Sequence, residues 1–253
     1  HLSIRRQRQM CIRDRGNPAD LNKFNIPVVL NSPHVGKNFQ DHLGLDYLYK
    51  TYFPTLNKDL GTWGGRVRSF LQYVYNRKGP LSLSLNQGGG YVKWKSLDPY
   101  PNIQLYFNPL TYSVSFKNKR PLLNTDKFNG FIIGFNSCRP KSLGEVNLQN
   151  VDNNYLPSID PRYLSDERDI HDLYSTFDFI RKFSLNKNIS NIIKSPVNID
   201  PIKLSDDELL DHFKSNATTI YHPCGTCRMS KEVNTGVVSE KLKVHGLDNL
   251  WVV

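Results

Sequence analysis

Strict alternation of apolar and polar side chains in the middle of the chain limits the possible folds more than any other feature. Ile103, Leu105 and Phe107 alternate with Gln104 and Tyr106. Successive side chains of a strand point to opposite faces of its sheet, so this pattern predicts strands with one covered face. Such a sheet is more often antiparallel than parallel, because parallel strands are usually covered on both faces.

Further strands and helices follow without a regular strand–helix–strand rhythm. Strands are indicated by the alternation at Val146 and Leu148 and by the apolar run 131–135. Val67, Phe70, Leu71 and Val74 recur at helical spacing, as do Ile170, Leu173, Tyr174, Phe177 and Ile180. We expect Ser165 to cap the second of these helices, and Ser205 with Glu208 to form a capping box on a third. This mixture predicts the α+β class.

The net charge of +10 is unevenly distributed over the 253 residues. Five arginines and one aspartate lie in residues 1–15, where "RRQRQMCIRDR" resembles a translated sequencing-library adapter. We therefore exclude residues 1–15 from the fold. The other interpretation is a basic arm for nucleic acid or targeting. The remaining charge is scattered, which is typical of a solvated surface, so we expect no nucleic-acid partner.

The sequence also bears on membranes and on the ends of the chain. No apolar run approaches the roughly 18 residues of a membrane span. No secretory leader is visible, which slightly favours the cytoplasm and leaves the localisation open. "NLWVV" (249–253) reads as an apolar strand that stops without a turn. A domain rarely ends inside a strand, since its backbone would be half paired, so we expect a fragment truncated at both ends.

Reactive side chains are densest in "YHPCGTCRMS" (221–230), which is compatible with zinc binding, thiol redox or proton abstraction. Cys224 and Cys227 match half of a deaminase zinc site, but none of the seven histidines begins the His-x-Glu that such a site requires. No second pair of ligands has zinc-knuckle spacing, so we expect no metal.

Thiol redox and base catalysis remain for this motif. Redox Cys-x-x-Cys pairs usually follow the first strand of a βαβ unit, whereas this pair comes late in the chain, which favours small packing residues. His222 precedes a proline, so its backbone is restricted to extended geometry. Gly225 permits close approach of another group. An imidazole suits proton removal near neutral pH, although a lone histidine is more often structural.

Four stretches carry a family resemblance. They are "VGKNFQDHLG" (35–44), "GEVNL" (144–148), "PSIDPRYLSDERD" (157–169), and a C-terminal series from "YHPCGTCRM" (221–229) through 236–238 to "LKVHGLDNLWVV" (242–253). In order and spacing they resemble the glucose-methanol-choline (GMC) flavin oxidoreductases, with Phe39 where the family usually has leucine. The resemblance covers residues 17–253.

This resemblance implies an enzyme that binds FAD and oxidises the CH–OH group of an alcohol to a carbonyl, with hydride passing to flavin N5. The family's catalytic histidine falls on His222, which would accept the hydroxyl proton. Gly36, Asn38 and His42 fall on positions near the cofactor. For His42, a role in stabilising its loop is an equal alternative.

The resemblance also implies domains. Residues 16–45 would be the tail of an FAD-binding α/β domain, 46–215 a substrate-binding domain, and 216–253 the return to the FAD-binding domain. The second catalytic residue and the dinucleotide fingerprint would lie outside the chain. We therefore expect the 253-residue chain alone to be inactive and to bind FAD poorly.

The substrate is expected to be a small-molecule alcohol. Choline-specific members tend to carry an acidic residue before the paired glycines, whereas this chain has Asn86 and Gln87, which favours a neutral alcohol. Tyr106, Phe107 and Tyr112 would line an apolar pocket or pack in the core. Oxidase or dehydrogenase activity and the oligomeric state stay open. The alternative from another class is a basic interaction protein whose Cys-x-x-Cys is incidental or binds zinc.

Overall fold

The protein divides into two units in a computed structural model that describes residues 14–96, 99–117, 120–150 and 156–253. Unit 1 comprises the described residues of 1–42, 140–169 and 219–253, and unit 2 comprises 43–139 and 170–218. This division differs from the predicted ranges at residues 140–169, which were expected in the substrate-binding domain. They belong to unit 1, because their backbone pairs with residues 36–39. What each range binds stays a prediction.

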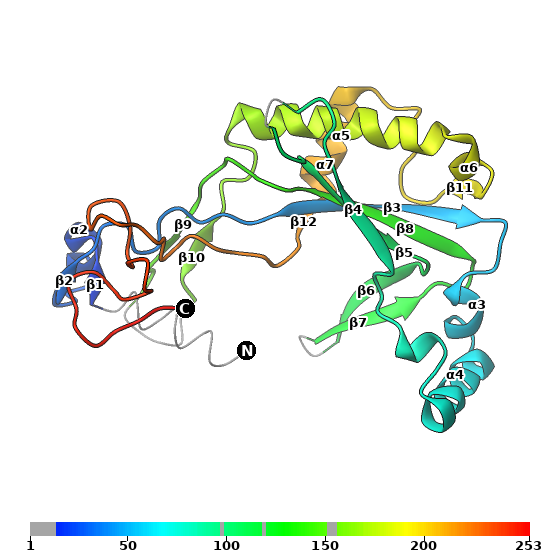
Figure 1. Cartoon of the computed structure of the whole chain (residues 1–253), viewed down its shortest axis with the longest axis horizontal. Helices are drawn as coiled ribbons and strands as arrows, with labels where there is room; N and C mark the ends of the chain where they lie inside the picture. Colours follow the sequence, from blue (N-terminus) through cyan, green and yellow to red (C-terminus); the bar gives the residue numbers. More distant parts are fainter. Residues whose placement is uncertain (1–13, 97–98, 118–119, 151–155) are drawn as a thin grey trace. The chain divides into compact units, whose positions relative to one another are not determined.

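An antiparallel sheet forms the centre of unit 2 (Figure 1), which confirms the predicted α+β class. Its strands follow the order β11-β3-β8-β5-β4, and β12 is the sixth strand. Their bounds are Leu43–Thr51 for β3, Gly88–Val92 for β4, Ile103–Asn108 for β5, Gly130–Ser137 for β8, Ile193–Pro196 for β11 and Thr218–Thr219 for β12. The strands predicted at 103–107 and 131–135 are thus both present.

Two helices pack against this sheet, α5 (Glu167–Leu185) and α7 (Asp206–Asn216). The ring of Phe213 in α7 lies 5.9 Å from Phe135 of β8 and 6.4 Å from Phe177 of α5. All three rings are fully buried, as are Tyr47 and Ile180. This aromatic cluster is the core of unit 2, and it confirms the buried stripe predicted for α5 at Leu173, Phe177 and Ile180.

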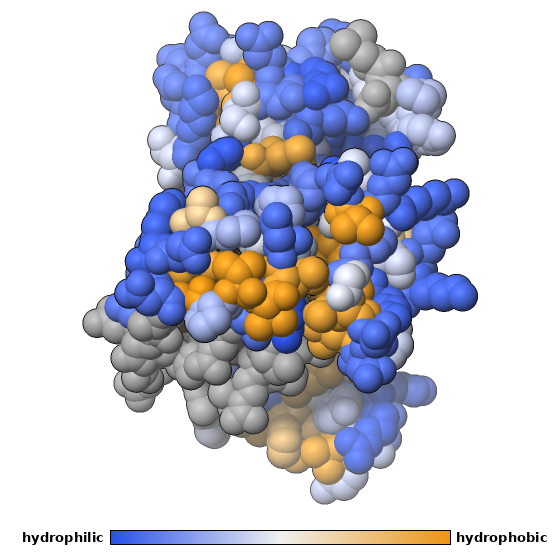
Figure 2. Space-filling model, turned by 90° about the vertical axis from the view of Figure 1, so that its left-hand side faces the viewer, coloured by the Kyte–Doolittle hydropathy of each residue, from blue (hydrophilic) through white to orange (hydrophobic). Residues whose placement is uncertain are grey.

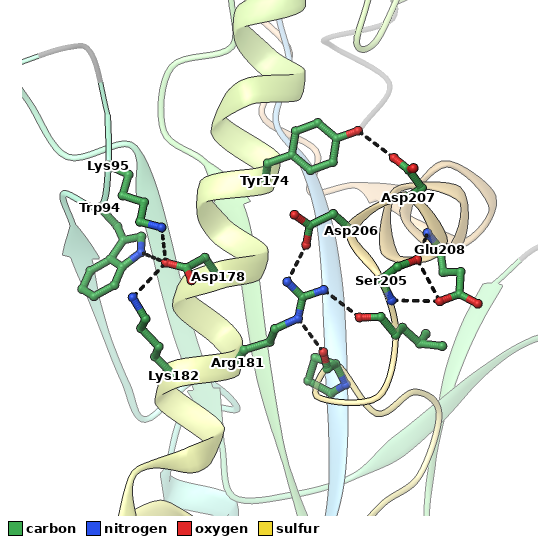
Figure 3. Close-up of polar contacts among 12 residues, drawn as sticks. Trp94, Lys95, Tyr174, Asp178, Arg181, Lys182, Ser205, Asp206, Asp207 and Glu208 are labelled. Atoms are coloured by element: carbon green, nitrogen blue, oxygen red, sulfur yellow. Dashed lines mark hydrogen bonds and ion pairs between the residues drawn. The ribbon is translucent and has the colours of Figure 1, made fainter.

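Capping interactions fix where these helices begin. Ser205 and Glu208 form the predicted capping box of α7 (Figure 3). The predicted cap of α5 is wrong by one residue, because Asp166 rather than Ser165 accepts the backbone N–H of Arg168, at 3.0 Å. Arg181 of α5 donates to the carboxylate of Asp206 and to two carbonyl oxygens just before α7, so it ties the two helices together.

A second part of unit 2 contains α3 (Leu56–Leu60), α4 (Trp63–Asn76), the 3-10 helix η1 (Pro80–Ser82) and a hairpin of β6 (Tyr112–Lys117) and β7 (Arg120–Thr125). Buried Asn57 organises it by donating to the carbonyl oxygen of Thr111 at 2.9 Å and to that of Asp126 at 3.1 Å. The short helix α6 (Lys187–Ser190) leads into β11.

Unit 1 is built from short elements: β1 (Arg15–Gly16), α2 (Pro18–Asn22), β2 (Leu30–Asn31), β9 (Glu145–Asn147) and β10 (Ser158–Asp160). β1 and β2 pair in parallel, and β9 and β10 pair antiparallel. Val237, Val238 and Val244 form a small buried core near the C-terminus. The strand predicted at 249–253 is wrong, since this segment makes only an isolated bridge from Trp251 to Lys243.

Hydrophobic residues gather in a band among hydrophilic ones on the face shown in Figure 2. Both units expose large apolar side chains, and those of unit 1 include Val29, Leu156, Ile159 and Val233. No helix in the described part of the chain is long and apolar enough to cross a membrane.

Candidate functional site

A ribbon of three backbone segments brings together the motifs found in the sequence. Residues 36–42 run through its middle, with 144–146 on one side and 220–226 on the other. Gln40 and Cys224 exchange backbone hydrogen bonds of 2.9 and 2.8 Å, and Phe39 and Gly144 exchange bonds of 2.9 and 2.8 Å. The stretches 35–44 and 221–230, nearly 180 positions apart in the sequence, are therefore neighbours within unit 1.

Two glycines allow the segments of this ribbon to approach so closely. Gly225 has φ +91° and Gly36 has φ +79°, the left-handed region that favours glycine. A Cβ on Gly225 would overlap the carbonyl oxygen of Asn38, and one on Gly36 would overlap that of Val146. The close approach predicted at Gly225 is thus present, and what approaches is the backbone of Asn38.

Asp41 is the polar centre of the ribbon, with only 6% of its surface exposed. Its Oδ1 accepts the backbone N–H groups of His42 and His222, both at 2.9 Å. Its Oδ2 accepts the hydroxyl of Tyr163 at 2.8 Å and the hydroxyl of Thr219. With four hydrogen bonds, the acceptor atoms of this buried carboxylate are well satisfied, and they join three distant segments.

Tyr163 is held in its donor form in this network. Burial, followed by its hydrogen bond to Asp41, raises the pKa of Tyr163 to about 12. The phenol therefore keeps its proton at any ordinary pH and continues to donate to the carboxylate. The family pattern points to His42 but not to Asp41 beside it, although Asp41 lies inside the stretch "VGKNFQDHLG".

His222 projects from this network with its side chain exposed. The preceding Tyr221 has φ +63°, an uncommon conformation for a residue other than glycine, and its N–H donates to the Thr219 hydroxyl at 2.9 Å. The imidazole rings of His222 and His42 lie edge to face, with centroids 5.6 Å apart and an interplanar angle of 65°. The structure thus brings together two of the predicted site residues, on backbones held by the same carboxylate.

The other cofactor candidates, Gly36 and Asn38, lie in the same ribbon. The side-chain oxygen of Asn38 accepts from Arg228 at 3.5 Å, and its Nδ2 is buried without a hydrogen-bond partner among the described residues. A buried donor without an acceptor is costly, so this amide suits a group that brings an acceptor atom. The contacts made by Gly36 show that it has a packing role; its contact with a cofactor stays a prediction.

Ion pairs support the other edge of the ribbon. Glu145 of β9 accepts from Lys37 at 2.5 Å and from Arg162 at 2.7 Å. The hydrogen bond from Lys37 is the main cause that lowers the pKa of Glu145. Because these groups are partly exposed, the pairs contribute more to the register between the segments than to stability.

The two cysteines of the motif occupy different surroundings. Cys224 is exposed, whereas Cys227 packs against the core formed by Val237, Val238 and Val244. Over the described ranges, no group of three or more His, Cys, Asp or Glu side chains is placed to hold a metal ion.

In unit 2, the three aromatic residues predicted to line a pocket or pack in the core have different surroundings. Tyr106 donates to Asp46 at 2.7 Å, and Phe107 packs 5.6 Å from the ring of Phe131. Burial raises the pKa values of Tyr106 and Tyr112. Tyr112 lines a cavity of about 390 Å³ together with Leu110 and other mainly apolar side chains, namely Leu60, Arg66, Leu81, Leu123 and Thr125. Of the three aromatic candidates, only Tyr112 lines this cavity.

Comparison with known proteins finds a family model that matches the C-terminal part of the chain. Residues 140–253 match the family model described as GMC oxidoreductase. The match includes β9, β10 and the motif at 221–230, and therefore two of the three segments of the ribbon.

Curated relatives extend the similarity over most of the chain. An alcohol dehydrogenase [acceptor] from Pseudomonas putida is 32% identical over 239 residues, which is 94% of this chain and 42% of that protein. An oxygen-dependent choline dehydrogenase from Cronobacter sakazakii is 30% identical over 94% of this chain and 41% of that protein. The chain thus spans about two fifths of the length of these relatives.

A solved structure shares the fold. A variant of the formate oxidase of Aspergillus oryzae RIB40, from work on FAD modification in that protein, superposes with a TM-score of 0.81 and 24% identity. The superposition covers 93% of this chain and 45% of the formate oxidase.

Proposed function

We propose that the chain belongs to the GMC oxidoreductase family, and that its protein binds FAD and oxidises the CH–OH group of an alcohol to a carbonyl. The names of the relatives support this proposal, since they include an alcohol dehydrogenase and choline dehydrogenases. FAD is included in the proposal because the structure of the formate oxidase with the same fold comes from work on FAD modification in that protein.

The observation that carries the proposal is the Asp41 network beneath His222. In the proposed reaction, His222 accepts the hydroxyl proton of the alcohol on an imidazole nitrogen. Bound FAD supplies the acceptor for the hydride from the carbinol carbon. A neutral imidazole has one ring nitrogen free to accept a proton, which suits this role. The rigid backbone below it keeps the ring in position, since Asp41 binds the His222 N–H at 2.9 Å.

We propose that His42 and Asn38 contact the cofactor, and that Gly36 shapes the loop that carries them. The Asn38 amide would donate from Nδ2 to an acceptor atom of FAD, which would satisfy a buried donor that lacks a partner among the described residues. His42 would share the environment of His222, because their rings are in edge-to-face contact.

A neutral alcohol is the proposed substrate. Recognition of a quaternary ammonium usually requires carboxylates or an aromatic cage. Asn86 and Gln87 precede β4 and supply neither.

The test uses the protein extended to the length of its relatives and purified with FAD. Anaerobic addition of a primary aliphatic or aryl alcohol should bleach the flavin absorbance, and choline should be the poorer reductant. A yellow protein whose flavin no alcohol reduces would overturn the proposed activity. Faster reduction by choline would overturn the substrate class and leave the activity standing.

A further inference from the structure

The outward face of α4 is apolar. Trp63 is 82% exposed, Phe70 58% and Tyr75 79%, and Val67, Leu71 and Val74 on the same side are also exposed. The sequence spacing correctly predicts a helix here. A helix on the surface of a protein normally turns such a stripe inward, so the orientation of α4 is reversed.

Contacts on the inner side of α4 hold this orientation. Ser69 is buried, and a Cβ on Gly65 would overlap the backbone oxygen of Asp59 in α3. The N-terminus is capped by Thr62, whose hydroxyl accepts the Gly65 N–H at 3.2 Å. Arg66 donates through Nε to the carbonyl oxygen of Leu60 at 2.6 Å. These close contacts favour small and polar groups on the inner side, and the large apolar side chains named above lie outside.

Positive charge surrounds the apolar face. At about 100° per residue, Arg68 falls on one side of the exposed arc and Arg77 falls on the other, whereas the side chain of Arg66 is held on the inner side by the Leu60 carbonyl oxygen. Lys78 follows directly after the helix, and residues 62–78 contain no aspartate or glutamate. Exposed aromatic side chains lie near both ends of the helix, at Trp63 and Tyr75.

We propose that α4 docks on an anionic lipid surface, with its axis in the plane of the membrane. The apolar side chains would enter the boundary between headgroups and acyl chains, and Arg68 and Lys78 would reach the lipid phosphates. Aromatic rings such as Trp63 and Tyr75 favour this interfacial layer. The 14 residues of α4 are too few to span a bilayer, so binding is peripheral. Charge selects lipid as the occupant, because a cationic rim without acids favours a surface of uniform negative charge. The proposal does not depend on the proposed oxidation.

Vesicle sedimentation of the 253-residue chain tests this proposal. The chain should bind vesicles that contain phosphatidylglycerol, and should bind pure phosphatidylcholine at least roughly tenfold more weakly. The tryptophan fluorescence of the wild-type chain should shift to the blue on binding. Trp63→Phe should remove the part of this shift that Trp63 contributes.

Matched variants separate the α4 surface from general adhesion. Phe70→Ser with Leu71→Ser should weaken binding roughly tenfold or more, and so should Arg68→Glu. Leu185→Ser and Lys214→Glu change an equally exposed apolar and an exposed basic residue on α5 and α7, and should bind as wild type. Because all these side chains are exposed, circular dichroism should show unchanged folding.

Three results would overturn the proposal. The first is absence of binding, or binding that the α4 variants leave unchanged. The second is a dimer in sedimentation velocity that Phe70→Ser dissociates, which would make this face an interface between two copies. The third is binding by the 253-residue chain together with no binding by the protein extended to the length of its relatives, which would show that the additional chain covers α4.

Discussion

Single residues in the ribbon decide where His222 points. Asp41 alone connects the backbones of His42 and His222 to hydroxyl groups of Tyr163 and Thr219. The need for glycine at position 225 could be predicted from the motif, whereas the role of His222 rests on the family resemblance and stays a proposal. Asp41 could not be predicted, because three of its four partners lie 122 to 181 positions away and only the folded chain brings them together.

Asp41→Asn should lower the free energy of unfolding of the chain by about 1–3 kcal/mol. An amide NH₂ group would replace one acceptor oxygen and face donors, leaving buried groups without partners. Urea unfolding followed by circular dichroism measures this change. Glu240→Gln, in an exposed ion pair of 3.6 Å with Lys231, is the control and should change stability little. Equal changes in the free energy of unfolding for the two variants would show that the hydrogen bonds of Asp41 do not stabilise the ribbon.

Gly225→Ala should be destabilising for two reasons. Its φ of +91° disfavours any residue with a Cβ, which costs about 1–2 kcal/mol, and the methyl group would overlap the carbonyl oxygen of Asn38. Gly90→Ala in β4 is the matched control, because a Cβ there meets nothing within 4 Å. Urea unfolding that finds Gly225→Ala no less stable than Gly90→Ala would contradict the close approach.

At the scale of elements, the same sequence pattern has two outcomes. The stripe of α5 and the stripe of α4 both have helical spacing, and both segments are helices. In α5 the stripe is buried against the sheet, whereas in α4 it faces outward. Periodicity therefore predicts a helix from local spacing, but which side of the helix is covered depends on its contacts with neighbouring elements, such as the close approach of Gly65 in α4 to Asp59 in α3.

Polar contacts on the exposed side of α5 predict that the folding stability of the protein falls at acidic pH. Asp178 accepts from Lys95 at 2.9 Å and from the indole of Trp94 at 2.8 Å, and mainly the Lys95 contact lowers its pKa to about 2 (Figure 3). A carboxylate whose pKa is lowered on folding stabilises the folded state at pH values above its ordinary pKa of about 4. This stability is lost as the pH falls toward about 2.

Asp178→Asn should therefore be less stable than wild type at neutral pH and should lose less stability between pH about 4 and about 2. Urea unfolding at several pH values measures both. The exposed Asp211→Asn serves as control. If wild type and Asp178→Asn lose stability in parallel over this range, the contacts of Asp178 make no net contribution.

At the scale of the whole molecule, the units are assembled from distant parts of the chain. The antiparallel sheet could be predicted from alternation, and the return of the C-terminus to the first residues from the family resemblance. The membership of 140–169 in unit 1 could not, because it depends on backbone pairing between Phe39 and Gly144 and on the Asp41–Tyr163 hydrogen bond. Pairing between segments a hundred residues apart leaves no local signal in either segment.

The most direct test of the account measures flavin reduction by alcohol in anaerobic stopped-flow, with the FAD protein extended to the length of its relatives. We predict that His222→Ala slows reduction roughly 10²–10⁴-fold, the usual contribution of a positioned base, without releasing the cofactor. Cys224→Ser, in the same ribbon, should reduce at the rate of wild type. Reduction by His222→Ala at the wild-type rate would contradict the central claim.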